Sequence, residues 1–589
     1  MLSLFSLIFS VLVYLTPLSL GAILHSSADL KSYDFIVIGA GPGGSTVSNR
    51  LTEDPSISVL LLEAGGANND SLTIDVPLLC TKLTPNTQWD WNYTTTPQPN
   101  LNNRVLPFPR GIGLGGTSAV NCLVYTRGSK QNIDKWAALS KDPSWGWDAM
   151  LPYFKKSEKF NLPVDGHNIT GQFDPAFHGF KGYIGVSVPG ASRAIDGRVI
   201  QTTEKLPDEF PFTTDMNTGD QLGVGWVQAL IDEGVRSSSA SYLAPQVLAR
   251  ENLDILLHTR VARVLPSSND SFNVVQYLDS ADGNLKNVTA SKEIILSAGA
   301  VGTPNILLHS GIGNATTLNS LGITPLLHLP SVGQNLTDHI GVSSTWLVNS
   351  TLTYDIVLRN TTLAETLLQQ WKEKKTGINV DTSENHLAFL RLPENSTILQ
   401  TFGDPAAGNE TAHFEFLFQN GLSQVTASGN YLNIPAGNVS PKSSGAITIN
   451  STNPFDAPLI DPGLLSAQID IHILREAIRT AHRFINASTA WSDYILQDLT
   501  NATTDDQIDE FIRDNAVSFF HPVATAAMSP FNTTDWGVVN PDLRVKGVKG
   551  LRIVDASVAP SLPAAHTSAA VYGIAEHAAD IIKSAYGLS

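Results

Sequence analysis

The sequence predicts a mixed α/β (α+β overall) protein: a Rossmann-like lobe that binds a dinucleotide, and an inserted lobe with a largely antiparallel sheet. Three observations predict this fold. A strand, a glycine-rich turn, a helix and a second strand follow one another over residues 34–63. A strand and a long helix return over residues 551–583. Residues 335–530 between them hold alternating apolar strands, so the first and last segments are expected to share one lobe.

The opening unit has the residue pattern of a dinucleotide-binding turn. Residues 34–38 are apolar and β-branched, which is typical of a strand buried on both faces, and residues 45–51 are expected to form a helix. The turn between them has the pattern G-x-G-x-x-G. Gly39 allows the tight turn, Gly41 lets the backbone approach a pyrophosphate, and Gly44 lets the helix pack on the strand.

Glu63 ends the second predicted strand, residues 59–62. An acidic residue about twenty positions past the last glycine can accept hydrogen bonds from both hydroxyls of a ribose. Its carboxylate would repel a 2′-phosphate, which disfavours NADP. The alternative interpretation of the glycine motif is a glycine-rich surface turn.

Length and charge set broad limits on the class of protein. A chain of 589 residues is too long for one small core and indicates two large lobes. Its 42% hydrophobic and 15% charged residues are typical of a soluble globular protein. The net charge of −17 argues against a nucleic acid or an anionic membrane as partner, although acidity can also simply keep a secreted protein soluble.

The N-terminus predicts secretion. Residues 2–21 are apolar and uncharged, which fits either a signal peptide or a membrane anchor. Pro17 interrupts the run and small residues follow it, so residues 1–22 are expected to be a cleaved signal, although the usual basic n-region is missing. Roughly sixteen N-x-S/T sites fit an extracellular glycoprotein with no membrane segment after cleavage.

The two cysteines, Cys80 and Cys122, could form one disulfide, which a chain of this length does not need for stability. No cysteine or histidine cluster predicts a metal site. Residues 66–110 are expected to form a long irregular stretch, and the glycine-rich residues 111–128 to open a helix and approach a ligand. Further predictions are helices over residues 237–248, 469–484 and 566–583, and strands over residues 253–265, 293–300, 413–418 and 551–555.

Four separated motifs make the chain resemble the glucose–methanol–choline (GMC) flavoprotein oxidoreductases over nearly its whole length after the signal. They are the glycine motif with Glu63, the block 111–127, the block 299–313, and His521-Pro522-Val523 followed by Asp555-Ala556-Ser557 and His566-Thr567. Within the family, the C-terminal motifs look most like those of fungal aryl-alcohol oxidases and pyranose dehydrogenases.

The resemblance implies a discontinuous FAD-binding domain, residues 31–150, 237–334 and 531–586, and a substrate-binding domain, residues 151–236 and 335–530. It also implies FAD rather than NAD. The residues matching cofactor contacts of the family are Gly39, Gly41, Gly44, Glu63, Thr117, Asn121, Val124, Val261, Asp555, Ala556 and Thr567.

The resemblance also implies how the cofactor is held. Some relatives attach FAD covalently to a histidine in the second block, and residues 118–122 contain none, so FAD is predicted to be non-covalent. Other relatives carry glutamine after the second catalytic His-Thr. Ser568 stands there in this chain, which leaves the contacts at the flavin edge less defined.

His521 and His566 are the predicted catalytic pair. Oxidation of an alcohol removes a hydride from carbon and a proton from oxygen, and a neutral imidazole suits the proton transfer because its pKa lies near working pH. The family match makes His521 the principal base and His566 its assistant. His339, His413 and His482 lack this support and are assigned structural roles.

Three aromatic residues are predicted to shape the substrate pocket. Phe520 precedes the base, Phe108 stands where aryl-alcohol oxidases carry a tyrosine, and Phe418 lies on a strand expected to cover the flavin. Rings at these positions would stack on an aromatic or allylic alcohol. The alternative for each ring is core packing.

The resemblance therefore implies oxidation of a primary aromatic or allylic alcohol to an aldehyde, with hydride passing to flavin N5 and O2 reoxidising the flavin to give H2O2. One alternative is a pyranose dehydrogenase that oxidises sugars and uses a quinone as acceptor. Another is a hydroxynitrile lyase on the same fold, and a non-enzymatic secreted binding protein is a fourth reading. The natural substrate and the oligomeric state stay open.

Overall fold

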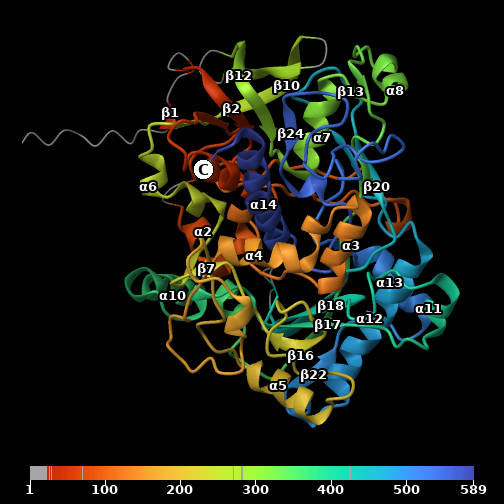
Figure 1. Ribbon diagram of the computed structural model, residues 1–589. Helices are drawn as coiled ribbons and strands as arrows, with labels where there is room; N and C mark the ends of the chain where they lie inside the picture. Colours follow the sequence, from red (N-terminus) through yellow and green to blue (C-terminus); the bar gives the residue numbers. More distant parts are fainter. Residues whose placement is uncertain are drawn as a thin grey trace, which may run out of the picture.

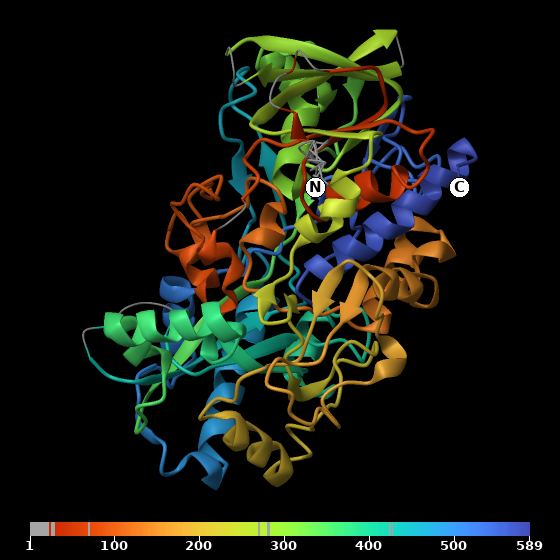
Figure 2. The ribbon, with the colours of Figure 1, turned by 90° about the vertical axis from the view of Figure 1, so that its left-hand side faces the viewer.

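The computed structural model describes residues 23–24, 27, 30–68, 71–268, 271–279, 283–422, 426 and 428–588. The predicted signal peptide, residues 1–22, lies outside the described residues. Two large sheets lie at opposite ends of an elongated molecule, with helices between and around them (Figures 1 and 2). None of the helices in the described part combines the length and hydropathy needed to cross a bilayer.

The first sheet joins the two ends of the chain. Its parallel part has the order β1-β9-β3-β2-β12, and β24 also pairs with β12. The apolar runs predicted from the sequence form these buried strands. The strands are β1 (Ile23–Leu24), β2 (Tyr33–Ile38), β3 (Val59–Leu62), β9 (Leu253–Leu256), β12 (Leu285–Leu296) and β24 (Leu551–Ile553), extended by the antiparallel β10 (Thr259–Ser268) and β11 (Ser271–Asp279).

Helices cover this sheet. Helix α1 (Pro42–Leu51) follows the glycine turn and lies beside α14 (Ser568–Tyr586), the long C-terminal helix in blue (Figure 1). Arg50 of α1 donates two hydrogen bonds, of 2.8 and 2.7 Å, to the carboxylate of Glu576 on α14. Because Glu576 is fully buried, this bidentate pair ties the first and last helices together.

The second sheet is antiparallel, as predicted, with the order β22-β16-β19-β18-β17-β6 and β23 paired to β16. One face packs against α12 (Gln468–Asn486) through apolar side chains. The strands are β6 (Gly223–Trp226), β16 (Ile340–Val348), β17 (Glu384–Leu390), β18 (Phe414–Gln419), β19 (Tyr431–Asn438), β22 (Ile495–Asp498) and β23 (Val517–Ser518).

The remaining helices and strands complete the molecule. The helices are α2 (Leu72–Asp75), α3 (Lys130–Ser140), α4 (Trp147–Ser157), α5 (Asp196–Lys205), α6 (Pro245–Leu248), α7 (Gly299–His309), α8 (Ala315–Ser320), α9 (Tyr354–Arg359), α10 (Thr361–Lys374), α11 (Thr397–Phe402) and α13 (Asp505–Asn515). The strands are β4 (Glu158–Phe160), β5 (Ile184–Val186), β7 (Ile231–Asp232), β8 (Val235–Arg236), β13 (Ile312–Gly313), β14 (Leu327–His328), β15 (Gln334–Leu336), β20 (Gly445–Thr448) and β21 (Leu459–Asp461).

Three predicted elements were wrong in detail. The single strand over residues 253–265 breaks into β9 and β10, because His258 adopts a left-handed φ of 52°. The helix over 237–248 is a 3-10 turn followed by α6, since the residue before Pro245 is extended. The glycine-rich block opens only a 3-10 turn, Gly116–Ala119.

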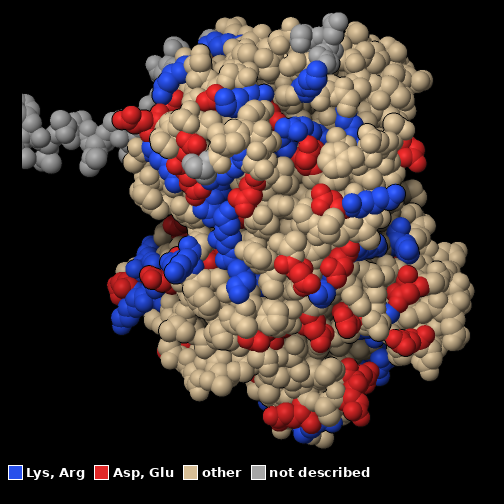
Figure 3. Space-filling view, in the orientation of Figure 1, with Lys and Arg blue, Asp and Glu red and all other residues tan. Residues whose placement is uncertain are grey.

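Cys80 and Cys122 form the disulfide that the sequence left open, with 5.2 Å between their Cα atoms. It closes a loop that contains most of the long irregular stretch and the first part of the glycine-rich block. On the face shown in Figure 3, lysine and arginine are interspersed with aspartate and glutamate.

Candidate active site and cofactor cleft

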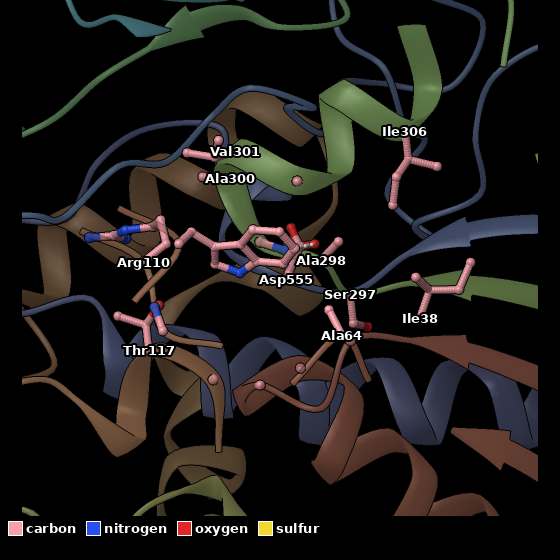
Figure 4. A pocket seen from close by; sticks show the side chains of 18 of the residues that line it. Ile38, Ala64, Arg110, Thr117, Ser297, Ala298, Ala300, Val301, Ile306 and Asp555 are labelled. Atoms are coloured by element: carbon pink, nitrogen blue, oxygen red, sulfur yellow. Dashed lines mark hydrogen bonds between the residues drawn. The ribbon is translucent and has the colours of Figure 1, made fainter. Parts of the chain in front are cut away.

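A cleft lies at the carboxyl ends of the parallel strands β2, β3 and β12. The glycine turn, Glu63 and Ala64 line one side, residues 297–302 line another, and Asp555 and Arg110 complete it (Figure 4). Open α/β sheets bind nucleotides in this position.

Close backbone packing explains the glycines of this cleft. Gly39 has a φ of 100°, and a Cβ atom there would lie 2.5 Å from the carbonyl oxygen of Ser297. At Gly44 a Cβ atom would lie 1.9 Å from the carbonyl oxygen of Gly39, so the helix could not sit so close to the turn. Gly41 caps α1 without a side-chain hydrogen bond, and a Cβ atom there would have Gly116 Cα as its nearest neighbour, at 4.0 Å; the free N–H groups at this helix N-terminus suit a phosphate.

Glu63 is buried at the edge of the cleft. Its carboxylate accepts hydrogen bonds from the N–H groups of Ala40 at 2.8 Å, and of Gly65 and Gly113 at 2.9 Å each. Burial raises the pKa of Glu63, and the backbone N–H groups oppose that shift. A carboxylate has about four acceptor positions, so these backbone bonds take up much of its capacity and hold it in a fixed orientation at the cleft.

The other predicted cofactor contacts divide into two groups. Thr117, Val261, Asp555 and Ala556 line the cleft, and Asp555 Oδ2 also accepts hydrogen bonds from the Gly299 N–H and the Thr303 hydroxyl. Four predicted contacts are not among the lining residues of this cleft: Gly44, Asn121, Val124 and Thr567.

Sequence reasoning missed several cleft residues. The Ser297 hydroxyl and the Asn305 Oδ1 are buried, line the cleft and have no hydrogen-bond partner in the described part of the chain. Trp91 stacks on Tyr93 with ring centres 5.7 Å apart, and the Arg260 guanidinium lies 5.2 Å from the Trp91 ring. Buried polar groups without partners are rare, so these groups fit a polar ligand that would satisfy them. Of these residues, only Trp91 and Tyr93 could have been noticed in the sequence, because they are aromatic side chains within a polar loop.

The structure brings His521 and His566 together from distant segments. Their ring centres lie 4.7 Å apart and the rings are inclined at 73°. Burial, together with the nearby His566, His339 and Arg110, holds the pKa of His521 well below its usual value. His521 is therefore neutral near pH 7 and able to accept a proton.

Buried acidic groups hold each member of the pair. The Nε2 of His566 lies 3.2 Å from Oε2 of Glu415, a buried carboxylate on β18. The backbone N–H of His521 donates to Asp338 Oδ1 at 2.7 Å. Arg110 lines the cleft, and its Nη2 donates to the carbonyl of Phe520 at 2.6 Å, so the pair and the cleft are neighbours.

His339, which the sequence assigned a structural role, contacts the pair. Its Nδ1 lies 3.0 Å from Nδ1 of His521. The other two histidines with that assignment make different contacts: His413 bonds the Leu392 N–H and Asp404, and His482 pairs with Asp498.

The three predicted pocket aromatics lie in different environments. Phe520 is 38% exposed beside His521. Phe108 is buried in a small apolar cluster with Val301 and neighbouring side chains. Phe418 packs 4.8 Å from the Phe484 ring of α12, because alternation along β18 turns it away from the face that carries Glu415. The structure therefore brings only Phe520 to the histidine pair.

A nucleotide-binding cleft next to a pair of histidines is the arrangement of a cofactor-dependent oxidoreductase. Sequence models of the GMC oxidoreductase family match residues 33–341 and 441–575, and the chain belongs to this family. Members bind FAD, and the open glycine turn, the helix N-terminus and the unpartnered Ser297 and Asn305 fit that cofactor. The protein is an FAD-dependent enzyme acting on CH–OH groups.

Curated relatives and solved structures agree with this assignment. The chain is 39% identical to dehydrogenase eriK of Hericium erinaceus, with 96% of this chain and 97% of the relative covered. It is 37% identical to pyranose dehydrogenase of Agaricus campestris, with 94% of each chain covered. A fungal aryl-alcohol oxidase structure is similar with a TM-score of 0.82, 28% identity, and 95% and 100% of the two chains covered.

Proposed function

We propose that the protein is a secreted alcohol oxidoreductase in which His521 accepts the hydroxyl proton of the substrate and His566 assists. The observation that carries this proposal is the contact between the two rings, 4.7 Å apart beside the cofactor cleft. When bound, FAD supplies the acceptor for the hydride that leaves the substrate carbon.

The residues around the two histidines support different roles for His521 and His566. Burial keeps His521 neutral, so its free nitrogen can take the proton. His566 directs Nε2 to the Glu415 carboxylate, which leaves its other nitrogen to orient the hydroxyl group.

We propose that the cofactor-binding assignments made from the sequence hold, with FAD bound non-covalently. Residues 118–122, the block in which some relatives carry the attachment histidine, contain no histidine, and Cys122 is held in a disulfide. The disulfide also supports an oxidising, extracellular location.

For the substrate, we propose a primary aromatic or allylic alcohol, with O2 as acceptor and H2O2 as product. The exposed ring of Phe520 beside His521 supports it. Phe108 and Phe418 no longer contribute, since both pack in apolar cores.

A second candidate is sugar oxidation with a quinone acceptor, because the sheet face that carries Glu415 also carries hydrogen-bonding side chains, next to the apolar Leu417. Gln419 lies on the same face of β18, and Asn433 of β19 donates to its Oε1 at 2.9 Å. Thr345 of β16 continues the row by donating to Asn433 Oδ1 at 3.0 Å. Such a row suits a substrate with several hydroxyl groups, and the similarity to pyranose dehydrogenase agrees with it.

Anaerobic flavin reduction tests the proposal. Purified enzyme is mixed with 4-methoxybenzyl alcohol or with glucose, and the flavin absorbance is followed. The reduced enzyme is then mixed with O2 or with benzoquinone. We expect reduction by the aromatic alcohol and fast reoxidation by O2; reduction by glucose and reoxidation only by the quinone would favour the second candidate. Mandelonitrile cleavage without any flavin reduction would contradict both.

A further inference from the structure

We propose that His339 is a positioning residue that fixes the tautomer of His521. In this proposal His339 Nδ1 accepts a hydrogen bond from His521 Nδ1–H, which leaves Nε2 of His521 as the atom that takes the substrate proton. The inference rests on the proposed role of His521 as the base.

The geometry of the two rings carries the argument. Their Nδ1 atoms are 3.0 Å apart, and the rings are nearly perpendicular at 88°, with centres 5.2 Å apart. Two imidazole nitrogens at this distance form a hydrogen bond only when one of them carries hydrogen and the other does not. The contact is therefore compatible with two arrangements, in which either His521 or His339 is the donor.

The surroundings of His339 and the proposed role of His521 together select one arrangement. The His339 side chain is fully buried, and burial lowers the pKa of His339 to about 3, with the nearby His566 adding to the effect. The ring is therefore neutral and carries a single hydrogen. If His339 Nδ1 were the donor, the neutral His521 would carry its own hydrogen on Nε2 and could not accept a proton there. A base at Nε2 of His521 therefore requires Nδ1 of His339 to be the acceptor.

The backbone fixes both rings in place. His339 immediately precedes β16, and β23 pairs with β16 at Ile340 and Ser518. The Phe519 N–H donates to the carbonyl of His339 at 2.9 Å. The two histidines thus flank two adjacent antiparallel strands, and their relative position does not depend on flexible side chains alone.

The turn that carries His521 is anchored a second time by the residue before His339. Asp338 accepts hydrogen bonds from the Ser518 hydroxyl and from the backbone N–H of His521. Phe520, between them, has a left-handed φ of 64°, a strained conformation for a bulky residue that persists only when its surroundings hold it. Residues 338 and 339 therefore hold the backbone and the ring of the base respectively.

The consequence is chemical. A neutral imidazole has one lone-pair nitrogen, and a base with its hydrogen on the wrong nitrogen cannot accept a proton at the substrate. With His339 as acceptor, the proton acceptor of His521 is Nε2 in every molecule. Without it, the two tautomers of His521 become mixed.

Two variants of His339 test this. His339→Ala removes the acceptor, and His339→Asn places an amide oxygen close to the position of Nδ1. The exposed His328→Ala is the matched control for loss of a histidine. Each FAD-loaded protein is examined by 15N NMR of its histidines, with the His521 signals assigned by their absence from His521→Gln, and by anaerobic flavin reduction with the alcohol found active.

We expect His521 to carry hydrogen on Nδ1 in the wild type and in His328→Ala. In His339→Ala we expect mixed tautomers and a reduction rate about 10- to 100-fold lower, less than the roughly 10²- to 10⁴-fold that the base itself contributes, because part of the His521 population keeps the productive tautomer. Substrate affinity should change less than the reduction rate. His339→Asn should recover part of the reduction rate that His339→Ala loses.

Two results would overturn the inference: a wild-type His521 with hydrogen on Nε2, or an unchanged reduction rate in His339→Ala. Failure of the proposed function is a separate outcome, because no alcohol would then reduce the wild-type flavin while the NMR measurement would still decide the tautomer.

Discussion

Replacing Glu415 by glutamine tests how the second histidine is held. The substitution keeps the size of the side chain and removes its charge. Glu415 is fully buried, its Oε2 lies 3.2 Å from His566 Nε2, and its Oε1 has no partner among the described residues. His566 is therefore the principal partner of this carboxylate.

The expected loss of rate in Glu415→Gln follows from the contact between Glu415 and His566. A hydrogen bond to a charged group contributes about 1.5–3 kcal/mol, and about 1.4 kcal/mol corresponds to a factor of ten in rate. Glu415→Gln should therefore slow flavin reduction by about 10- to 150-fold if the carboxylate stabilises His566 in the transition state. Substrate binding should change less, because the neutral amide still holds the ring.

Stopped-flow absorbance under anaerobic conditions measures this rate. The exposed Glu410→Gln removes a charge close by in the sequence and serves as control. A Glu415→Gln enzyme that reduces its flavin as fast as the control would refute the argument that the buried carboxylate supports His566.

Three further predictions concern the cofactor and the stability of the fold. Acid precipitation should release all the flavin into the supernatant, and flavin absorbance remaining with the protein pellet would show a covalent bond. Replacing both Cys80 and Cys122 by serine should lower the free energy of unfolding by about 4 kcal/mol, because the disulfide spans 42 residues; denaturant unfolding measures it. His178 is buried between Glu158 and Asp215 at 2.6 and 2.7 Å, and although burial opposes protonation, these hydrogen bonds raise its pKa. Its stabilisation is therefore complete below pH about 6.5 and is lost as pH rises through the raised pKa, so the Tm difference between wild type and His178→Gln should shrink from pH 6 to pH 9, and a constant difference would contradict this.

The local residue pattern was sufficient to predict the strand, glycine turn and helix at the start of the first sheet. The strand at residues 34–38, the glycine turn and the following helix are adjacent in the chain, so their spacing alone predicts their contacts. Gly39 and Gly44 occupy positions where no side chain fits, and the motif states this directly.

The sequence could not predict which strands far apart in the chain pair with each other, or which of their faces meet the core. His339 and His521 are 182 residues apart and meet only because β16 and β23 pair. Whether Phe418 faces the site or the core depends on which face of β18 meets α12, and a shift of one residue would reverse it. The break at His258 depends on a backbone conformation that an alternating pattern does not reveal. The lobe boundaries and the individual cofactor contacts remain predictions.

The most direct test of the central claim is single-turnover flavin reduction by His521→Ala. The variant should bind FAD with a normal absorbance spectrum, because the cleft residues are unchanged, and should reduce it on the order of 10²- to 10⁴-fold more slowly than the wild type. A fully loaded variant that reduces its flavin within a few-fold of the wild-type rate would show that another group accepts the proton.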